Sequence, residues 1–213
     1  MYRDSLSRGC PCFGEGEIEM KWLKRIDIIL IIVLFLIILY QNMPKTIFYD
    51  KVSENVYVED GVDKEGVDYI QQTIARMPDV IKEKFTDGGW NVIVKKSEIA
   101  DGYEKTVIGE TIKEEKTVYV LEGWEGISLI HEFGHIYLDE HPYDDKFLEI
   151  YEKEAKSLID AYDFGESYYS SDSVEYFCEA WKLVLIHREE VKEVAPETYE
   201  YFADLFDELY GVE

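Results

Sequence analysis

The sequence predicts an α+β fold, in which a small mixed or antiparallel sheet is followed by a helical C-terminal part. Three observations support this prediction. The β-prone runs all precede Gly123, the segments after Gly123 carry apolar residues at helical spacing, and an unbroken apolar run at residues 28–40 predicts a separate N-terminal helix. No internal repeat or low-complexity tract divides the 213 residues, so we expect one domain of ordinary size with a short appendage.

The N-terminal apolar run has the composition of a transmembrane segment. It reads IILIIVLFLIILY, and with the apolar residues just before it we expect membrane contact over residues 26–40 and a transmembrane helix over residues 20–42. A basic cluster precedes the run and only Lys45 closely follows it, which predicts a cytoplasmic N-terminus and an extracellular C-terminal domain. The following QNMPK offers no small-residue cleavage site, so we expect an uncleaved signal-anchor. A buried core helix is the alternative, but this run is apolar on every side.

The segments flanking this run lack clear periodicity. Residues 1–19 show neither helical nor strand spacing, and MKWLKR from Met20 is typical of the start of a signal-anchor, so we expect translation to begin at Met20 rather than Met1. Residues 43–63 are mixed in composition and are expected to form a tether to a domain over residues 64–213.

Composition restricts the classes of function. The net charge is −24, and its excess lies after residue 40, because residues 1–40 hold equal numbers of acidic and basic side chains. Such a domain repels nucleic acid, so we expect no nucleic-acid partner and a basic or neutral polypeptide as an easier one. The three cysteines, Cys10, Cys12 and Cys178, form no CxxC pair and are too few for a disulfide framework. A metal site would therefore use histidine and carboxylate.

Within the domain, helical spacing comes first and strand patterns follow. Apolar residues at helical spacing predict a helix over Val67–Phe85, ended by Gly88 and Gly89, and alternation predicts a strand over Trp90–Val94. Two β-prone runs, 106–112 and 117–121, predict an antiparallel hairpin. Four helices are expected after Gly123, near residues 126–140, 145–161, 172–188 and 196–210.

The first of these four helices carries the sequence HEFGH. Residues four apart lie on one helix face, so His131 and His135 can present two imidazoles to one zinc ion, with Glu132 beside them. Gly134 weakens a helix, which predicts close approach by a neighbouring element. Chance occurrence is the alternative, but two of the chain's four histidines fall in this motif.

A catalytic zinc site normally has three protein ligands and a water, so a third ligand is needed. His141 stands where an HExxHxxGxxH pattern has its third histidine, but Leu138 replaces the required glycine, and on a continuing helix His141 lies about 240° round from His135. Glu154 stands near a thermolysin-like position, but Leu158 follows where a second carboxylate is expected.

The third candidate is Glu175. Glu175 and Glu179 lie four residues apart on one helix face, a like-charge pair that needs a positive neighbour. In this interpretation Glu175 binds the metal, and Glu179 accepts a hydrogen bond from the free ring N–H of a ligand histidine. His131 is the preferred donor. The alternative is a capping box, with Asp172 as N-cap and Glu175 three residues later.

These residues carry a resemblance to a known family. HEFGH, the segment YYSSDSVEYFCEAW at 168–181 and the helix after Ala195-Pro196-Glu197-Thr198 make residues 64–213 resemble the catalytic domain of anthrax lethal factor and the Pro-Pro endopeptidases. The resemblance implies a zincin-like, gluzincin-type metallopeptidase fold with one zinc ion and cleavage near proline. It places the metal on His131, His135 and Glu175, with Glu132 as general base.

The same resemblance assigns two further positions. It implies Tyr168 as the residue that stabilises the oxyanion, with Tyr169 as a rival. Cys178 departs from the family, which usually has a small residue such as alanine there.

The sequence therefore predicts a membrane-anchored zinc endopeptidase acting on extracellular or cell-envelope proteins, with a substrate strand pairing along an edge of the 106–121 hairpin. One rival is a cytoplasm-facing HExxH peptidase that cleaves a regulator of a mobile element. Another is a catalytically inactive, membrane-tethered binding or immunity protein with the same fold. Glu132 disfavours the inactive protein, because a dead site has no need of that carboxylate.

Overall fold

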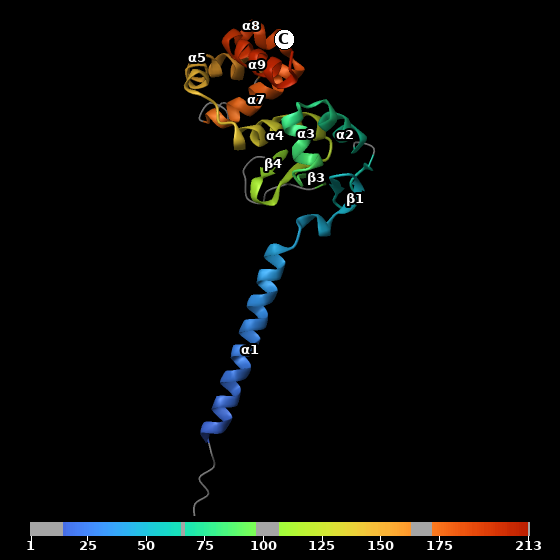
Figure 1. The fold of residues 1–213 in the computed structure, drawn as a ribbon, viewed down its shortest axis with the longest axis vertical. Coiled ribbons are helices and arrows are strands. Elements are labelled where there is room, and N and C mark those ends of the chain that lie inside the picture. Colours follow the sequence, from blue (N-terminus) through green and yellow to red (C-terminus); the bar gives the residue numbers. More distant parts are fainter. Residues whose placement is uncertain (1–14, 65–66, 97–106, 163–171, 213) are drawn as a thin grey trace, which may run out of the picture. The chain divides into compact units, whose positions relative to one another are not determined.

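The computed structural model describes residues 15–64, 67–96, 107–162 and 172–212, and the chain divides into two units, Met1–Pro44 and Lys45–Glu213 (Figure 1). The first unit contains helix α1 (Glu15–Asn42), whose apolar side chains from Ile28 to Tyr40 are 46–66% exposed. The predicted transmembrane segment at 20–42 lies in α1. Among the residues described, however, no helix is long and apolar enough to cross a membrane.

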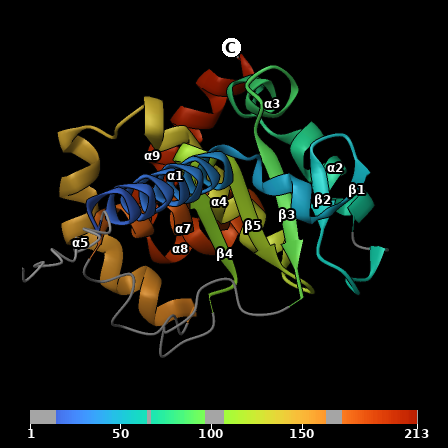
Figure 2. The same ribbon diagram turned by 90° about the horizontal axis from the view of Figure 1, so that it is seen from below.

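The second unit contains a mixed five-stranded sheet, whose strands lie side by side in Figure 2. Its strands are β1 (Asp50–Ser53), β2 (Val56–Val58), β3 (Asn91–Lys95), β4 (Gly109–Ile112) and β5 (Thr117–Leu121), in the order β1-β2-β3-β5-β4. The β1–β2 and β4–β5 pairs are antiparallel, whereas β3 runs parallel to both β2 and β5. The predicted α+β fold with a small mixed sheet is confirmed, and so is the predicted hairpin, which turns through η3 (Lys113–Glu115).

The expectation of a tether over residues 43–63 is wrong for its central part. After the short helix η1 (Lys45–Phe48), residues 50–58 form β1 and β2 of the sheet. Val56 and Val58 are fully buried, because β2 pairs with the central strand β3.

The single helix predicted over Val67–Phe85 is two helices, α2 (Val67–Arg76) and α3 (Asp79–Thr86). Pro78 separates them, since proline lacks the N–H of a helical hydrogen bond and disfavours helical backbone at the residue before it. Both helices still bury the predicted apolar face, including Ile70 and Ile81.

The C-terminal part is helical, as predicted, and its described residues form one helix more than expected. It comprises α4 (Glu125–Glu140), α5 (Asp145–Tyr162), α7 (Ser173–Ile186), α8 (Arg188–Val194) and α9 (Pro196–Tyr210). The helix expected near 172–188 ends at Ile186, and α8 begins at Arg188. Buried aromatic side chains fix α7 against its neighbours: Phe177 contacts Phe147 of α5 and Phe202 of α9, with ring centroids 5.1 and 4.8 Å apart. This packing positions one face of α7 for the site described next.

Candidate active site

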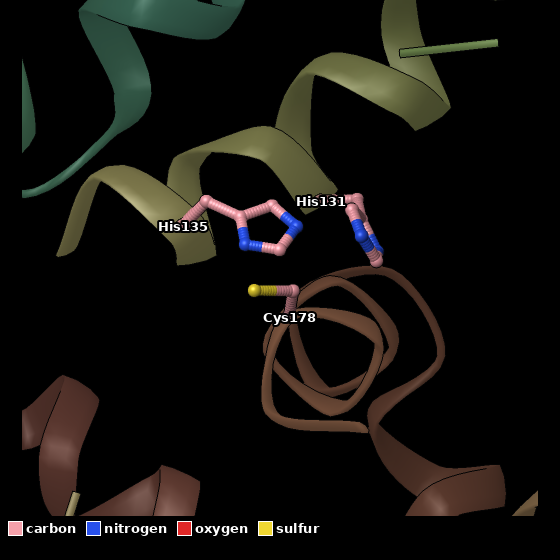
Figure 3. A group of neighbouring side chains, drawn as sticks. All are labelled: His131, His135 and Cys178. Atoms are coloured by element: carbon pink, nitrogen blue, oxygen red, sulfur yellow. The ribbon is translucent and has the colours of Figure 1, made fainter. Parts of the chain in front are cut away.

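Helices α4 and α7 pack unusually closely, and Gly134 makes this possible. A Cβ added to Gly134 would lie 2.8 Å from the Cα of Cys178, a distance that real side chains do not tolerate. The close approach predicted from Gly134 is therefore confirmed. It brings the histidine face of α4 against the acidic face of α7, where both imidazoles project toward the α7 helix (Figure 3).

The side chains of His131, His135 and Glu175 converge between the two helices. One Glu175 oxygen lies 3.2 Å from His131 Nε2, and the other lies 3.5 Å from His135 Nε2. Ligand atoms bound to zinc at about 2.05 Å in a tetrahedron are about 3.3 Å apart. Each imidazole therefore lies from a Glu175 oxygen at about the separation of two ligands on one ion. Asp172 caps α7 by accepting the N–H of Val174 at 2.8 Å, while the Glu175 carboxylate is directed to the imidazoles.

Behind the imidazoles lies a buried pair of opposite charges. Glu179 Oε2 is 3.0 Å from Nδ1 of His131, and Glu179 Oε1 is 2.5 Å from Nζ of Lys182. The side chains of Glu179 and Lys182 are only 2% and 11% exposed. Sequence reasoning overlooked Lys182, although a lysine three residues after Glu179 in the apolar run AWKLVLI was a usable signal.

The electrostatics of the cluster favour a positive group at its centre. Burial acts to lower the pKa of His131, but hydrogen bonds to Glu175 and Glu179 outweigh it and raise that pKa to about 9. Burial acts to raise the pKa of Glu175, but hydrogen bonds to His131 and His135 lower it to about 2. The pKa of Glu179 is also lowered against the effect of burial, by His131 and Lys182. The metal-free chain therefore holds a proton on His131 between carboxylates, where a metal cation would serve as well.

Glu132 lies on the same helix, 5% exposed, and is oriented by the sheet. Thr111 of β4 donates a hydrogen bond from Oγ1 to Glu132 Oε2 at 2.7 Å. Burial raises the pKa of Glu132, while the nearby imidazoles and the Thr111 hydrogen bond oppose that rise. Gly109 lets β4 approach this closely, because a Cβ there would lie 2.6 Å from Glu132 Oε1. Thr111 could not be identified from the sequence, because only the tertiary packing of β4 on α4 brings it to Glu132.

The other two candidates for third ligand lie elsewhere. His141 follows the last turn of α4 as an exposed residue, and its ring stacks on Tyr137 with centroids 4.8 Å apart. Glu154 is buried on α5 and accepts hydrogen bonds from the first residues of α9: the N–H of Glu197 and both the N–H and the hydroxyl of Thr198. Glu154 therefore caps a helix. Tyr168 and Tyr169 lie outside the described residues.

Cys178 belongs to the same cluster. It is fully buried on α7, and its Sγ and one ring nitrogen each of His131 and His135 all lie within 4.8 Å of one another (Figure 3). Burial, with the carboxylates of Glu175 and Glu132 nearby, raises the pKa of the thiol well above its ordinary value. A neutral thiol therefore accompanies the two imidazoles in the metal-free chain.

Comparison with known proteins gives a family match and a similar solved structure. Residues 106–205, which contain α4, α7 and most of α9, match the family described as "Anthrax toxin lethal factor, N- and C-terminal domain". Among solved structures, the chain is similar to the PRO-PRO endopeptidase PPEP-2 from Paenibacillus alvei. The TM-score is 0.52 at 23% sequence identity, over 71% of this chain and 97% of PPEP-2. No curated protein matches. The resemblance predicted from the sequence is confirmed, and the solved structure shows a shared fold.

Proposed function

We propose that this chain is a zinc-dependent endopeptidase. The observation that carries the proposal is the convergence of His131, His135 and Glu175 beside the buried carboxylate of Glu132. Two imidazoles and one carboxylate form a donor set typical of catalytic zinc, which keeps a further position open. The residues present therefore fit a zinc ion, with Glu179 fixing the orientation of His131 through its Nδ1.

Each residue has a definite task in peptide hydrolysis. Zinc bound here would polarise the scissile carbonyl and acidify the attacking water. Glu132 takes the proton of that water and returns it to the leaving amine, and Thr111 holds the carboxylate in position for both transfers. Tyr168, or Tyr169 in its place, donates a hydrogen bond to the developing oxyanion.

The substrate would bind as an added strand along β4. This strand forms one edge of the sheet, and no other described strand pairs with its free side. Because Thr111 of β4 contacts Glu132, a peptide paired with β4 would pass close to the general base. Cleavage near proline is part of the proposal, supported by the similarity to PPEP-2.

We further propose a single-pass membrane anchor through α1, with the catalytic unit on the extracellular face. The exposed apolar side chains from Ile28 to Tyr40 support membrane contact, and the basic cluster before them supports the orientation. A reporter fused after Glu213 should be active only outside the cytoplasm, and the protein should leave membranes only with detergent. A cytoplasmic reporter signal would favour the rival peptidase that cleaves an intracellular regulator.

Peptide-library profiling of the purified chain tests the central proposal. The wild type should cleave peptides, with proline enriched beside the cut, and chelation should abolish cleavage. Glu132→Ala should lose cleavage but retain one zinc per chain, because Glu132 is not a ligand. Undiminished cleavage by Glu132→Ala would refute the assigned mechanism, and a zinc-loaded wild type that cuts no peptide would favour a binding protein.

A further inference from the structure

We propose that Cys178 is a ligand of the same metal, so that its thiolate closes the site when no peptide is bound. The inference rests on the proposed zinc site. It assigns a metal-binding role to a residue outside the His131, His135 and Glu175 set, and it implies a resting state in which no position is open for water.

The positions of the donor atoms carry this proposal. The Cys178 Sγ and one ring nitrogen of each histidine lie within 4.8 Å of one another. In a tetrahedral zinc site with bonds of about 2.05 Å to nitrogen and 2.3 Å to sulfur, nitrogen and sulfur are about 3.6 Å apart. To reach that separation, the donor atoms would have to approach one another by at most about 1.2 Å. Cys178 also lies three residues after Glu175, so both side chains share one face of α7.

The backbone keeps the thiol at this place. The Cα of Cys178 lies where a side chain on Gly134 would clash, so α7 holds Cys178 directly against the zinc-binding turn of α4. The residue is fully buried, which removes it from reaction partners in solvent. Within the described part of the chain, ring nitrogens of both histidines lie near its Sγ, and the carboxylates of Glu175, Glu132 and Glu179 act on the thiol.

The binding step is simple in chemical terms. A bond forms between Sγ and the metal, the S–H bond breaks, and its proton leaves to solvent; nothing is oxidised or reduced. Four protein ligands make a closed site of the structural type, whereas release of Sγ leaves three ligands and an open position. Cys178 should therefore strengthen metal binding and slow peptide cleavage.

Cobalt substitution in the full chain tests this directly. Cys10 and Cys12 are replaced by serine in every protein, which leaves Cys178 as the only thiol. With one Co²⁺ bound, this parent should show a near-ultraviolet thiolate-to-cobalt charge-transfer band. Cys178→Ser and Cys178→Ala should lack the band and bind the metal at least about tenfold more weakly. The Glu175→Ala variant should keep the band once loaded.

The proposal would be overturned if the cobalt-loaded parent lacked the band and its spectrum were identical to those of Cys178→Ser and Cys178→Ala. Cobalt content and circular dichroism show that each variant is loaded and folded. Peptide cleavage is measured separately, and Cys178→Ala should cut faster than the parent. If the parent shows the band but cleaves no peptide, the proposed endopeptidase function is wrong and the thiolate ligand is supported. If the parent cleaves peptides but lacks the band, the endopeptidase function is supported and the thiolate ligand is wrong.

Discussion

Replacing Glu154 with alanine distinguishes a carboxylate that holds the fold from one that binds metal. Glu154 is 6% exposed, and its two oxygens accept three hydrogen bonds from Glu197 and Thr198 at 2.8–3.1 Å. Two of the donors are backbone N–H groups in the first turn of α9, which have no partner within their own helix. The variant leaves the buried N–H of Thr198 and the part-buried N–H of Glu197 without their acceptor, while the Thr198 hydroxyl keeps its contact with the Tyr176 hydroxyl at 2.7 Å.

The structure sets the size of the expected loss. An unsatisfied buried donor costs about 1–3 kcal/mol, and such terms add incompletely when the donors share one partner. We expect Glu154→Ala to lower the free energy of unfolding by about 3–5 kcal/mol. In a unit of this size, that corresponds to a melting temperature lower by about 6–20 °C. Glu154→Gln keeps one acceptor oxygen and should lose about half as much.

Thermal unfolding by circular dichroism and metal analysis after zinc loading form the assay, with Glu175→Ala as the matched variant. Glu154→Ala should melt lower and retain one zinc per chain, whereas Glu175→Ala should lose zinc at the same free concentration. An unchanged melting temperature for Glu154→Ala would refute its capping role. Loss of zinc from Glu154→Ala together with its retention by Glu175→Ala would refute the assigned third ligand.

Three further predictions follow from the same contacts. Thr111→Val removes a hydrogen bond that opposes the raised pKa of Glu132, so the acidic limb of the kcat/KM profile should move to higher pH. Thr111→Ser keeps the hydroxyl and should restore the wild-type profile. An unmoved acidic limb in Thr111→Val would contradict the contact. Gly134→Ala should destabilise the chain by about 1–3 kcal/mol in chemical denaturation, because its Cβ would meet the backbone of Cys178. An unchanged denaturation midpoint would argue against the tight packing of α4 on α7. In the metal-free protein, the free energy of unfolding should fall as pH rises from 6.5 through about 9, because folded His131 loses its proton there. It should also fall as pH drops from 4.5 toward 2, because folded Glu175 gains a proton there. Urea titrations across pH, with and without zinc, measure this, and a flat alkaline profile without metal would contradict it.

Apolar periodicity predicted the long amphipathic segments of the fold, whereas the break between α2 and α3 is signalled by Pro78 and not by the periodicity. Periodicity from Ile70 to Phe85 reports which face is buried, and that face continues across Pro78 even though the helix does not. Strand β2, in contrast, could not be predicted from periodicity. Three residues are too few to reveal alternation, and β2 is a strand because Val56 pairs with Val92, far away in the chain.

In the candidate site, too, some residues were predictable from the sequence and others were not. Sequence spacing alone placed His131 and His135 on one face, and the like-charge pair of Glu175 and Glu179 indicated a nearby positive group. Thr111 could not be found this way, because its contact with Glu132 depends on β4 packing against α4.

The need for a positive group connects the charge pattern of the sequence with the geometry of the folded chain. Glu132, Glu175 and Glu179 are brought together in one poorly solvated place, and Lys182 forms an ion pair with Glu179. Carboxylates so placed destabilise one another unless a cation stands between them. In the metal-free chain the proton on His131 fills that role, as its raised pKa indicates. Zinc binding must displace this proton, so metal affinity should increase with pH up to about 9. The charge pattern that made Glu175 a candidate in the sequence is therefore the same one that would bind the metal in the folded chain.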